Sequence, residues 1–187
     1  MKKYSVYDES IYQYTKILKS PNLKKNVELI SGILKNYKKQ KKRVVIAGNG
    51  GSSSIASHFS VDMTKVVGIR SINFNEHNLI TCLTNDFGQD NWLKKAFELY
   101  TDRNDLVILI SSSGKSKNIL NAAKFCKNRG NKVLTLTGFN KNNPLKKLAT
   151  HSIWIDSKAY NIIENVHQII LLMSCDMVLG SVYYKSN

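Results

Sequence analysis

The sequence predicts an α/β fold, a three-layer α-β-α sandwich in which helices cover both faces of a central parallel sheet. Short apolar runs alternate along the chain with segments of helical periodicity, as in proteins with parallel sheets. The strand expected over 105–110 is continuously apolar after Asp105, which is typical of a parallel strand covered on both faces. With 187 residues the chain suits one domain. We expect a helical N-terminal extension over 1–40 and an α/β core over 41–187.

The first half of the chain begins with two segments of helical spacing, 5–19 and 22–39, which Pro21 separates. The second segment carries an apolar stripe formed by Leu23, Val27, Ile30, Ile33 and Leu34. The core elements expected next are a buried strand over 43–47, a helix over 53–66, a short strand over 69–74 and helices over 78–84 and 90–100.

The second half repeats the alternation of strand and helix. Gly130 stands where a glycine commonly ends a helix, so the helix expected after the strand 105–110 covers 116–129. The remaining expected elements are a strand over 132–137, a short helix over 145–149, a strand over 152–155 and a long final helix over 160–179. Such a sheet binds ligands beyond the carboxyl ends of its strands.

The net charge of +15 raises nucleic acid as a partner. The densest basic run, Lys38 to Arg43, has two explanations: a surface for polyanions, or a solvated helix end before a strand. We favour the second, because cations suit a helix C-terminus. Lysine and asparagine are also frequent along the whole chain, and we do not expect nucleic acid as a partner.

The cysteines and the N-terminus indicate a reducing compartment. Cys82, Cys126 and Cys175 are far apart and form no CxxC pair, so we expect free thiols. No segment near Met1 resembles a signal peptide. The most apolar stretch, 166–182, contains His167, Gln168 and Asp176 and is typical of a buried helix rather than a membrane span. We expect a cytoplasmic protein with no membrane partner.

Two loops rich in small residues follow expected strands. The first is Gly48-Asn49-Gly50-Gly51-Ser52 and the second is Ser111-Ser112-Ser113-Gly114-Lys115-Ser116. Each precedes a helix, whose N-terminal N–H groups favour an anion. The glycine loop fits neither the GxGxxG spacing nor a P-loop, so we expect no nucleotide cofactor. A plain turn explains the glycines and a helix cap explains one or two serines, but four hydroxyls and a lysine favour a phosphate.

Two pairs of acidic and histidine residues flank these loops. His58 and Asp62 stand four apart on the helix after the glycine loop, and Glu164 and His167 stand three apart on the last helix. Side chains of these types transfer protons or bind a divalent metal. A lone histidine is more often structural, and we assign His77 and His151 to that class.

Taken together, these motifs resemble those of the phosphoheptose isomerases, which are SIS-domain proteins. The matching segments are Gly48-Asn49-Gly50-Gly51-Ser52, His58-Phe59, Asn85-Asp86-Phe87-Gly88, Ser111 to Ser116 and Thr135-Leu136-Thr137-Gly138. The resemblance extends over nearly the whole chain. It implies the SIS fold and the conversion of sedoheptulose 7-phosphate to D-glycero-D-manno-heptose 7-phosphate, for the heptose of a lipopolysaccharide or capsule.

The resemblance also implies where the substrate lies. It implies a homotetramer with active sites built between subunits, and a phosphate held by Ser111, Ser112, Ser113 and Ser116. It places Asn49, Gly50, Gly51, Ser52, Asn85 and Asp86 around the sugar. In the family a Glu on the helix after the glycine loop is the base, and a His on the last helix is the acid. Some members also bind zinc through these two residues, a second His and a Gln.

This chain departs from the family pattern at the catalytic positions. His58 matches the zinc-binding His, but Asp62 stands at the Glu position, Glu164 at the Gln position and Leu172 at the His position. His167 cannot replace that His by simple geometry, because positions 167 and 172 point about 140° apart on a helix. Asp62, Glu164 and His167 are nevertheless the side chains near these positions that can move a proton. We expect them to be the catalytic residues, with Glu164 as the base. At the family's zinc-binding positions, His58, Asp62 and Glu164 are the residues that could still bind zinc.

The function expected is an aldose–ketose isomerase of sugar phosphates, with the heptose as first substrate and another sugar phosphate as a variant. The alternative is a non-catalytic binding protein that resembles a relative known to bind the replication initiator DnaA, since Leu172 removes the family's acid. A third interpretation is a sensor of sugar phosphates. Turnover separates the first interpretation from the other two.

Overall fold

The protein is an α/β sandwich built on five parallel strands, as the computed structural model shows over residues 5–183. The strands are β1 (Val44–Gly48), β2 (Ser71–Ile72), β3 (Leu106–Ile110), β4 (Lys132–Thr137) and β5 (His151–Trp154). Their order in the sheet is β2-β1-β3-β4-β5. Gly48 pairs with Ile110, and Ile110 with Leu136. The carboxyl ends of β1, β3 and β4 therefore meet at one edge of the sheet.

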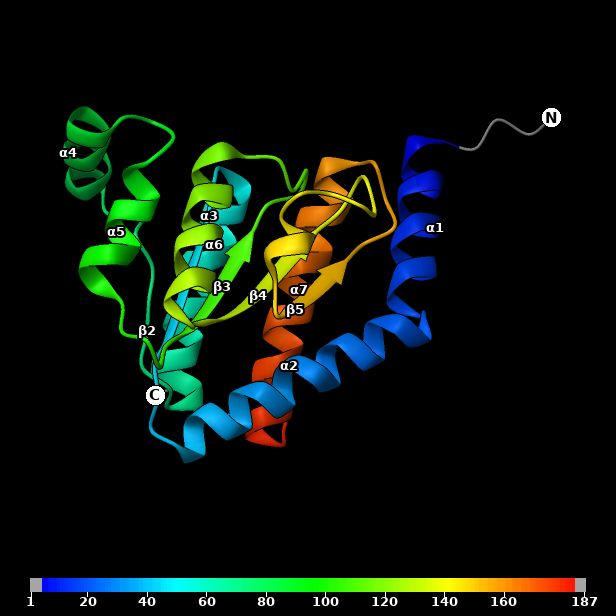
Figure 1. The fold of residues 1–187 in the computed structure, drawn as a ribbon. Coiled ribbons are helices and arrows are strands. Elements are labelled where there is room, and N and C mark those ends of the chain that lie inside the picture. The colour runs from blue at the N-terminus through cyan, green and yellow to red at the C-terminus, as the bar shows by residue number, and fades with distance from the viewer. Residues whose placement is uncertain (1–4, 184–187) are drawn as a thin grey trace.

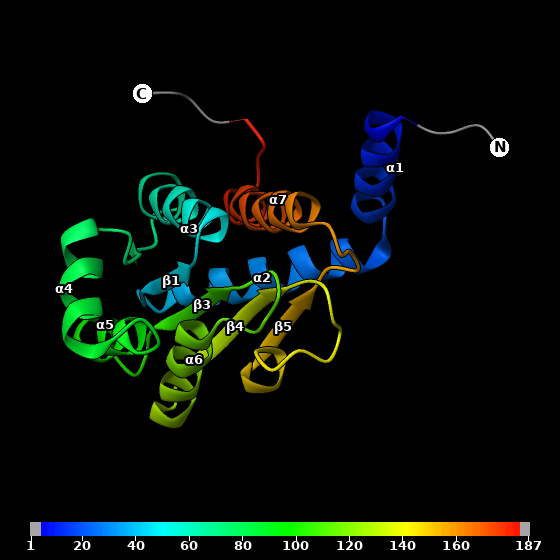
Figure 2. The ribbon, with the colours of Figure 1, turned by 90° about the horizontal axis from the view of Figure 1, so that it is seen from above.

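Helices cover both faces of this sheet, which confirms the predicted three-layer fold (Figures 1 and 2). The helices are α1 (Val6–Leu18), α2 (Pro21–Lys39), α3 (Gly51–Asp62), α4 (His77–Phe87), α5 (Trp92–Tyr100), α6 (Lys117–Arg129) and α7 (Tyr160–Leu179). Helices α2, α3 and α7 enclose one apolar core with alternate residues of the central strands, such as Val44 and Ile46. Helices α5 and α6 enclose the other core with the intervening residues, such as Val45 and Ala47.

The two N-terminal helices differ in how they are stabilised. Ser5 caps α1 in a capping box with Asp8, and Pro21 occupies the first turn of α2, where its missing N–H costs nothing. The stripe predicted on α2 lies in the core, with Leu23, Val27, Ile30 and Leu34 buried. Helix α1 buries none of its residues and projects from the body of the molecule (Figure 2).

Several predicted boundaries shift. The helix expected over 53–66 begins at Gly51 and changes at Met63 into a π-helical segment, η1 (Met63–Val67). Helix α4 runs through Phe87, so Asn85 and Asp86 lie in its last turn rather than in a separating loop. The short helix expected over 145–149 is a 3₁₀ turn, η2 (Lys146–Leu148). The final helix was predicted with its observed bounds.

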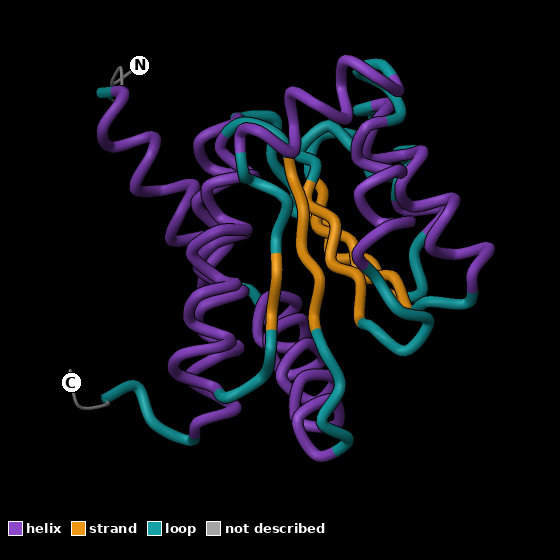
Figure 3. Tube along the Cα trace, turned by 90° about the vertical axis from the view of Figure 1, so that its left-hand side faces the viewer, coloured by secondary structure: helices purple, strands orange, loops and turns teal. Residues whose placement is uncertain are grey.

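Among the described residues one helix, α7, is long and apolar enough to cross a membrane. Its inner side packs against α2 and α3 in the sandwich, and Figure 3 shows it alongside the sheet. The length and composition of α7 are therefore explained by its place in the core.

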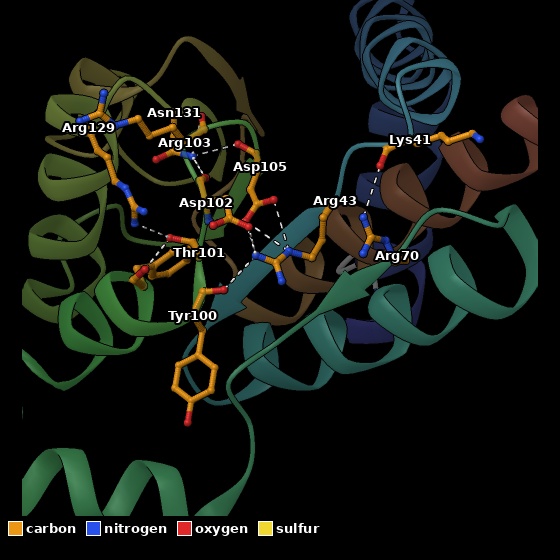
Figure 4. Close-up of polar contacts among 11 residues, drawn as sticks. Lys41, Arg43, Arg70, Tyr100, Thr101, Asp102, Arg103, Asp105, Arg129 and Asn131 are labelled. Atoms are coloured by element: carbon orange, nitrogen blue, oxygen red, sulfur yellow. Dashed lines mark hydrogen bonds and ion pairs between the residues drawn. The ribbon is translucent and has the colours of Figure 1, made fainter.

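A polar network joins the amino ends of the strands, at the edge of the sheet opposite the serine loop (Figure 4). The guanidinium of Arg43 contacts the carboxylate of Asp105 at 2.6 Å and also donates to the carbonyl of Tyr100. The amide of Asn131 donates to the carbonyls of Asp102, Arg103 and Asp105. The side chain of Asp105 is only 5% exposed, and this carboxylate beside the guanidinium raises the pKa of Arg43.

We expect the substitution Arg43→Met to lower the free energy of unfolding by about 2–3 kcal/mol, because it leaves the buried Asp105 carboxylate without its cation. Arg70→Met is the matched control, since Arg70 is exposed and, among residues 5–183, its guanidinium reaches only the carbonyl of Lys41 at 3.5 Å. Urea unfolding of both variants measures the effect. Equal stability of the two variants would contradict this role for Arg43.

Candidate active site

A small cavity opens at the carboxyl ends of β1 and β3, where the two predicted loops meet. Its volume is about 140 Å³. The residues lining it are Asn49, Ser52, Ile110, Ser111, Ser112, Ser113, Ser116, Tyr160 and Glu164. The structure thus brings the glycine loop, the serine loop and the start of the last helix together at one cavity.

The serine loop is folded as a tight turn that presents hydroxyl groups to the cavity. The N–H of Gly114 donates to the carbonyl of Ser111, and Gly114 has the positive φ of 64° that the turn requires. The hydroxyls of Ser111 and Ser116 lie 3.3 Å apart. The hydroxyl of Ser112 is buried and has no partner within the described part of the chain. One hydroxyl of the Ser111–Ser116 pair donates to the other, which leaves the second hydroxyl of the pair and that of Ser112 to donate to an anion.

Two helix N-termini begin at this cavity. Ser116 precedes α6 and Gly50 precedes α3, and at neither position does a side chain cap the helix. The first N–H groups of α6 are therefore available, whereas the N–H groups of Ser52 and Ser53 in α3 donate to the carbonyls of Asn49 and Gly50. Each helix adds the positive end of its dipole. Backbone donors, hydroxyls and two dipoles favour a phosphate without a metal ion.

Glu164 brings a carboxylate into the same cavity. It projects from the second turn of α7 onto the backbone of Gly51, and a Cβ added at Gly51 would lie 2.9 Å from its carboxyl carbon. A side chain at position 51 would push the flexible end of Glu164 aside, so Gly51 lets the carboxylate lie against the glycine loop. A carboxylate fixed beside a phosphate loop can accept a proton from a bound substrate.

Asn49 links two segments of the site. Its side-chain amide exchanges two hydrogen bonds of 2.9 Å with that of Asn118 on α6. This pair ties the glycine loop to the helix that follows the serine loop. Asn49 lines the cavity, but its amide is occupied by Asn118.

Asn85 and Asp86 do not line the cavity. Both are exposed at the end of α4, where the amide of Asn85 donates to the carboxylate of Asp86 at 3.0 Å. Within one chain the structure does not bring them to the serine loop.

His58 and Asp62 also lie away from the cavity. They stand on α3 roughly 10 and 16 Å along the helix from Gly51, at ~1.5 Å per residue. His58 Nε2 is 3.5 Å from Asp62 Oδ2, and the amide of Gln168 on α7 lies 3.1 Å from His58 Nδ1. This second cluster, His58–Asp62–Gln168, is half-exposed.

The residues expected for zinc are therefore not gathered. Over residues 5–183 no group of three or more His, Cys, Asp or Glu side chains is placed to hold a metal ion. Glu164 faces the cavity, whereas His58 and Asp62 form the separate cluster. The donor set that the described residues of one chain provide does not fit zinc.

His167 is fully buried in the core. Its Nε2 lies 3.2 Å from the carbonyl of Thr137, and its Nδ1 has no partner among the described residues. Burial lowers the pKa of His167 to about 4, although the hydrogen bond to Thr137 opposes that shift. The ring does not line the cavity, which argues against the expected contact with substrate and favours a structural role.

The sequence prediction missed Tyr160 as a lining residue. Its place one helical turn before Glu164 was the available signal, because residues four apart share a helix face.

Comparisons with known proteins agree with this fold. Residues 7–138 match the family described as SIS domain. A phosphoheptose isomerase of Buchnera aphidicola is 32% identical over 167 residues, which are 83% of this chain and 84% of the relative. One from Helicobacter pylori is 30% identical over 162 residues, which are 83% of this chain and 82% of the relative.

Solved structures give the same fold. A phosphoheptose isomerase from Francisella tularensis superposes with a TM-score of 0.84 at 22% identity, covering 94% of this chain and 95% of that one. A second, from Neisseria gonorrhoeae, has a TM-score of 0.83 at 22% identity and covers 92% of this chain and 94% of that one. At this identity the superposition bears on the fold alone.

The burial of His167 predicts a pH dependence of stability. Its folded pKa lies below the unfolded value of 6.5, so the unfolded state takes up the proton first as the pH falls. The stability from the neutral ring is complete above about pH 6.5 and is lost by about pH 4, a change of about 3 kcal/mol.

Urea unfolding between pH 7 and 4 measures this change as the difference between wild type and His167→Gln, whose amide does not titrate. His77→Gln is the control, because the side chain of His77 is 88% exposed. If wild type and His167→Gln lose stability in parallel over this range, the assignment fails.

Proposed function

The chain belongs to the SIS-domain family of phosphoheptose isomerases, and we propose that it interconverts sedoheptulose 7-phosphate and a heptose 7-phosphate. One observation carries this proposal: the Glu164 carboxylate shares a cavity with the four serines of the serine loop and with two helix N-termini that no side chain caps. The relatives that share its sequence are named phosphoheptose isomerases. The product would serve the heptose of a surface polysaccharide, in the cytoplasm.

The reaction needs a base that moves one proton between adjacent carbons. The serine loop binds the phosphate through Ser111, Ser112, Ser113 and Ser116. Glu164 takes a proton from C1 of the ketose while the C2 carbonyl oxygen gains a proton, which gives an enediol. Glu164 then returns its proton to C2 as the C1 hydroxyl loses one. Atoms and electrons balance without a redox cofactor.

We propose in addition that the protein assembles as a homotetramer. Exposed apolar side chains on α3 and α7 support a contact there: Val61 is 58%, Met173 42% and Met177 37% exposed. Helix α1 leaves Val6 and Tyr12 exposed as well. Such an assembly would cover the His58–Asp62–Gln168 cluster with a second subunit.

A non-catalytic binding protein, like the DnaA-binding relative, is the second candidate. The observation in its favour is Leu172, which stands where the family has its acid and which neither ligates nor transfers a proton. Turnover decides between the two candidates.

We expect purified protein to convert sedoheptulose 7-phosphate to an aldose, followed by NMR with and without added zinc. Glu164→Gln removes the base but keeps the shape of the side chain, so turnover should fall by at least about 100-fold. Glu98→Gln is the control, because Glu98 is half-exposed on α5, away from the cavity, and its carboxylate pairs with Lys95. Binding without turnover of this or any other sugar phosphate would favour the binding protein.

A second prediction concerns the space at Gly51. Gly51→Ala places a methyl group against the Glu164 carboxylate and displaces it, so we expect at least about a tenfold loss of kcat with the fold retained. Gly32→Ala is the control, since nothing lies within 4 Å of its added Cβ. Wild-type kcat in Gly51→Ala would show that the close contact does not position the carboxylate.

A further inference from the structure

We propose that the hydroxyl of Tyr160 is the proton donor to the substrate's carbonyl oxygen, in place of the acid that Leu172 removes. This inference rests on the proposed isomerase function and assigns the partner of Glu164.

The composition of the cavity leaves few candidates for this role. Of the residues that line it, only Glu164 and Tyr160 carry a carboxyl or phenol group; the others are serines, an asparagine and an isoleucine. His167 is buried in the core. His58 lies in the separate cluster, with Asp62 and Gln168 beside its two ring nitrogens.

Tyr160 and Glu164 reach the cavity from one helix face. They are four residues apart at the start of α7, so their Cβ atoms are neighbours about 5–6 Å apart. Side chains on a helix lean toward its N-terminus, which directs Glu164 toward the turn that carries Tyr160. The base and the proposed acid would then act on adjacent atoms of one substrate.

The ring of Tyr160 is held although the residue is 57% exposed. It packs on the ring of Phe139 with centroids 4.7 Å apart and an interplanar angle of 59°. Phe139 has a φ of +49°, a conformation that a bulky residue rarely adopts. Such strained residues concentrate at functional sites.

The turn that carries Phe139 is fixed to the serine loop. The N–H of Gly138 donates to the carbonyl of Ser112 at 2.8 Å. A Cβ at Gly138 would lie 2.5 Å from Ile163 on α7, so only glycine lets this turn approach α7. Phosphate loop, turn and Tyr160 are thus joined into one unit, which places the phenol at a set distance from a bound phosphate.

The chemistry suits a neutral phenol. As the base withdraws a carbon proton, negative charge develops on the carbonyl oxygen, and a phenol can donate its proton to that oxygen. The phenolate then recovers a proton from the hydroxyl that becomes the new carbonyl. No co-reactant is consumed.

The test compares Tyr160→Phe with wild type in the sedoheptulose 7-phosphate assay. The phenyl ring keeps the packing on Phe139 and loses only the hydroxyl, so we expect kcat to fall at least about 100-fold with KM changed less than about threefold. Tyr100→Phe is the matched control: Tyr100 is 50% exposed and packs on Phe74 at 6.0 Å, on α5. Its kcat should equal that of wild type.

Three results would overturn the proposal. If Tyr160→Phe keeps wild-type kcat while Glu164→Gln loses it, the isomerase stands and Tyr160 is not its acid. If Tyr160→Phe changes KM alone, the hydroxyl binds the sugar without transferring a proton. If wild type turns over no sugar phosphate, the proposed function and the role of Tyr160 fall together.

Discussion

The contact between Gly51 and Glu164 is the constraint on which the site depends. It joins the first turn of α3 to the second turn of α7, and the two residues are more than one hundred positions apart in the sequence. Because the register aligns the ends of β1, β3 and β4, the same contact sets the carboxylate beside the serine loop. The absence of a side chain at Gly51 thus determines where a proton acceptor lies relative to a bound phosphate.

Much of this arrangement was predictable from local patterns. Buried parallel strands such as β3 are continuously apolar, and Gly130 and Pro21 mark helix ends by their backbone chemistry. The serine loop was identified because its hydroxyls stand between a strand and a helix, where N–H groups are free. Glu164 was assigned as the base from its late-helix position, and the structure brings it to the predicted loops.

The rest of the site could not be predicted, because the spacing of residues along the chain does not give the distances between segments in the folded protein. His167 shares a helix with Glu164 but faces the core, because the first apolar residues of α7 turn that side toward β4. His58 and Asp62 share a helix with the glycine loop but lie several turns from it. Tyr160 drew no prediction, since its contact with Phe139 depends on a left-handed residue after β4 that no local pattern marks. The pairing of Asn49 with Asn118 likewise joins two distant segments.

The central claim is that Glu164 moves the substrate's carbon-bound proton. Incubation of sedoheptulose 7-phosphate with the protein in D₂O, followed by NMR, tests it most directly. The account predicts that wild type introduces deuterium at the carbons that exchange the proton, and that Glu164→Gln still binds the sugar phosphate but introduces none. Deuterium uptake at the wild-type rate by Glu164→Gln would contradict it.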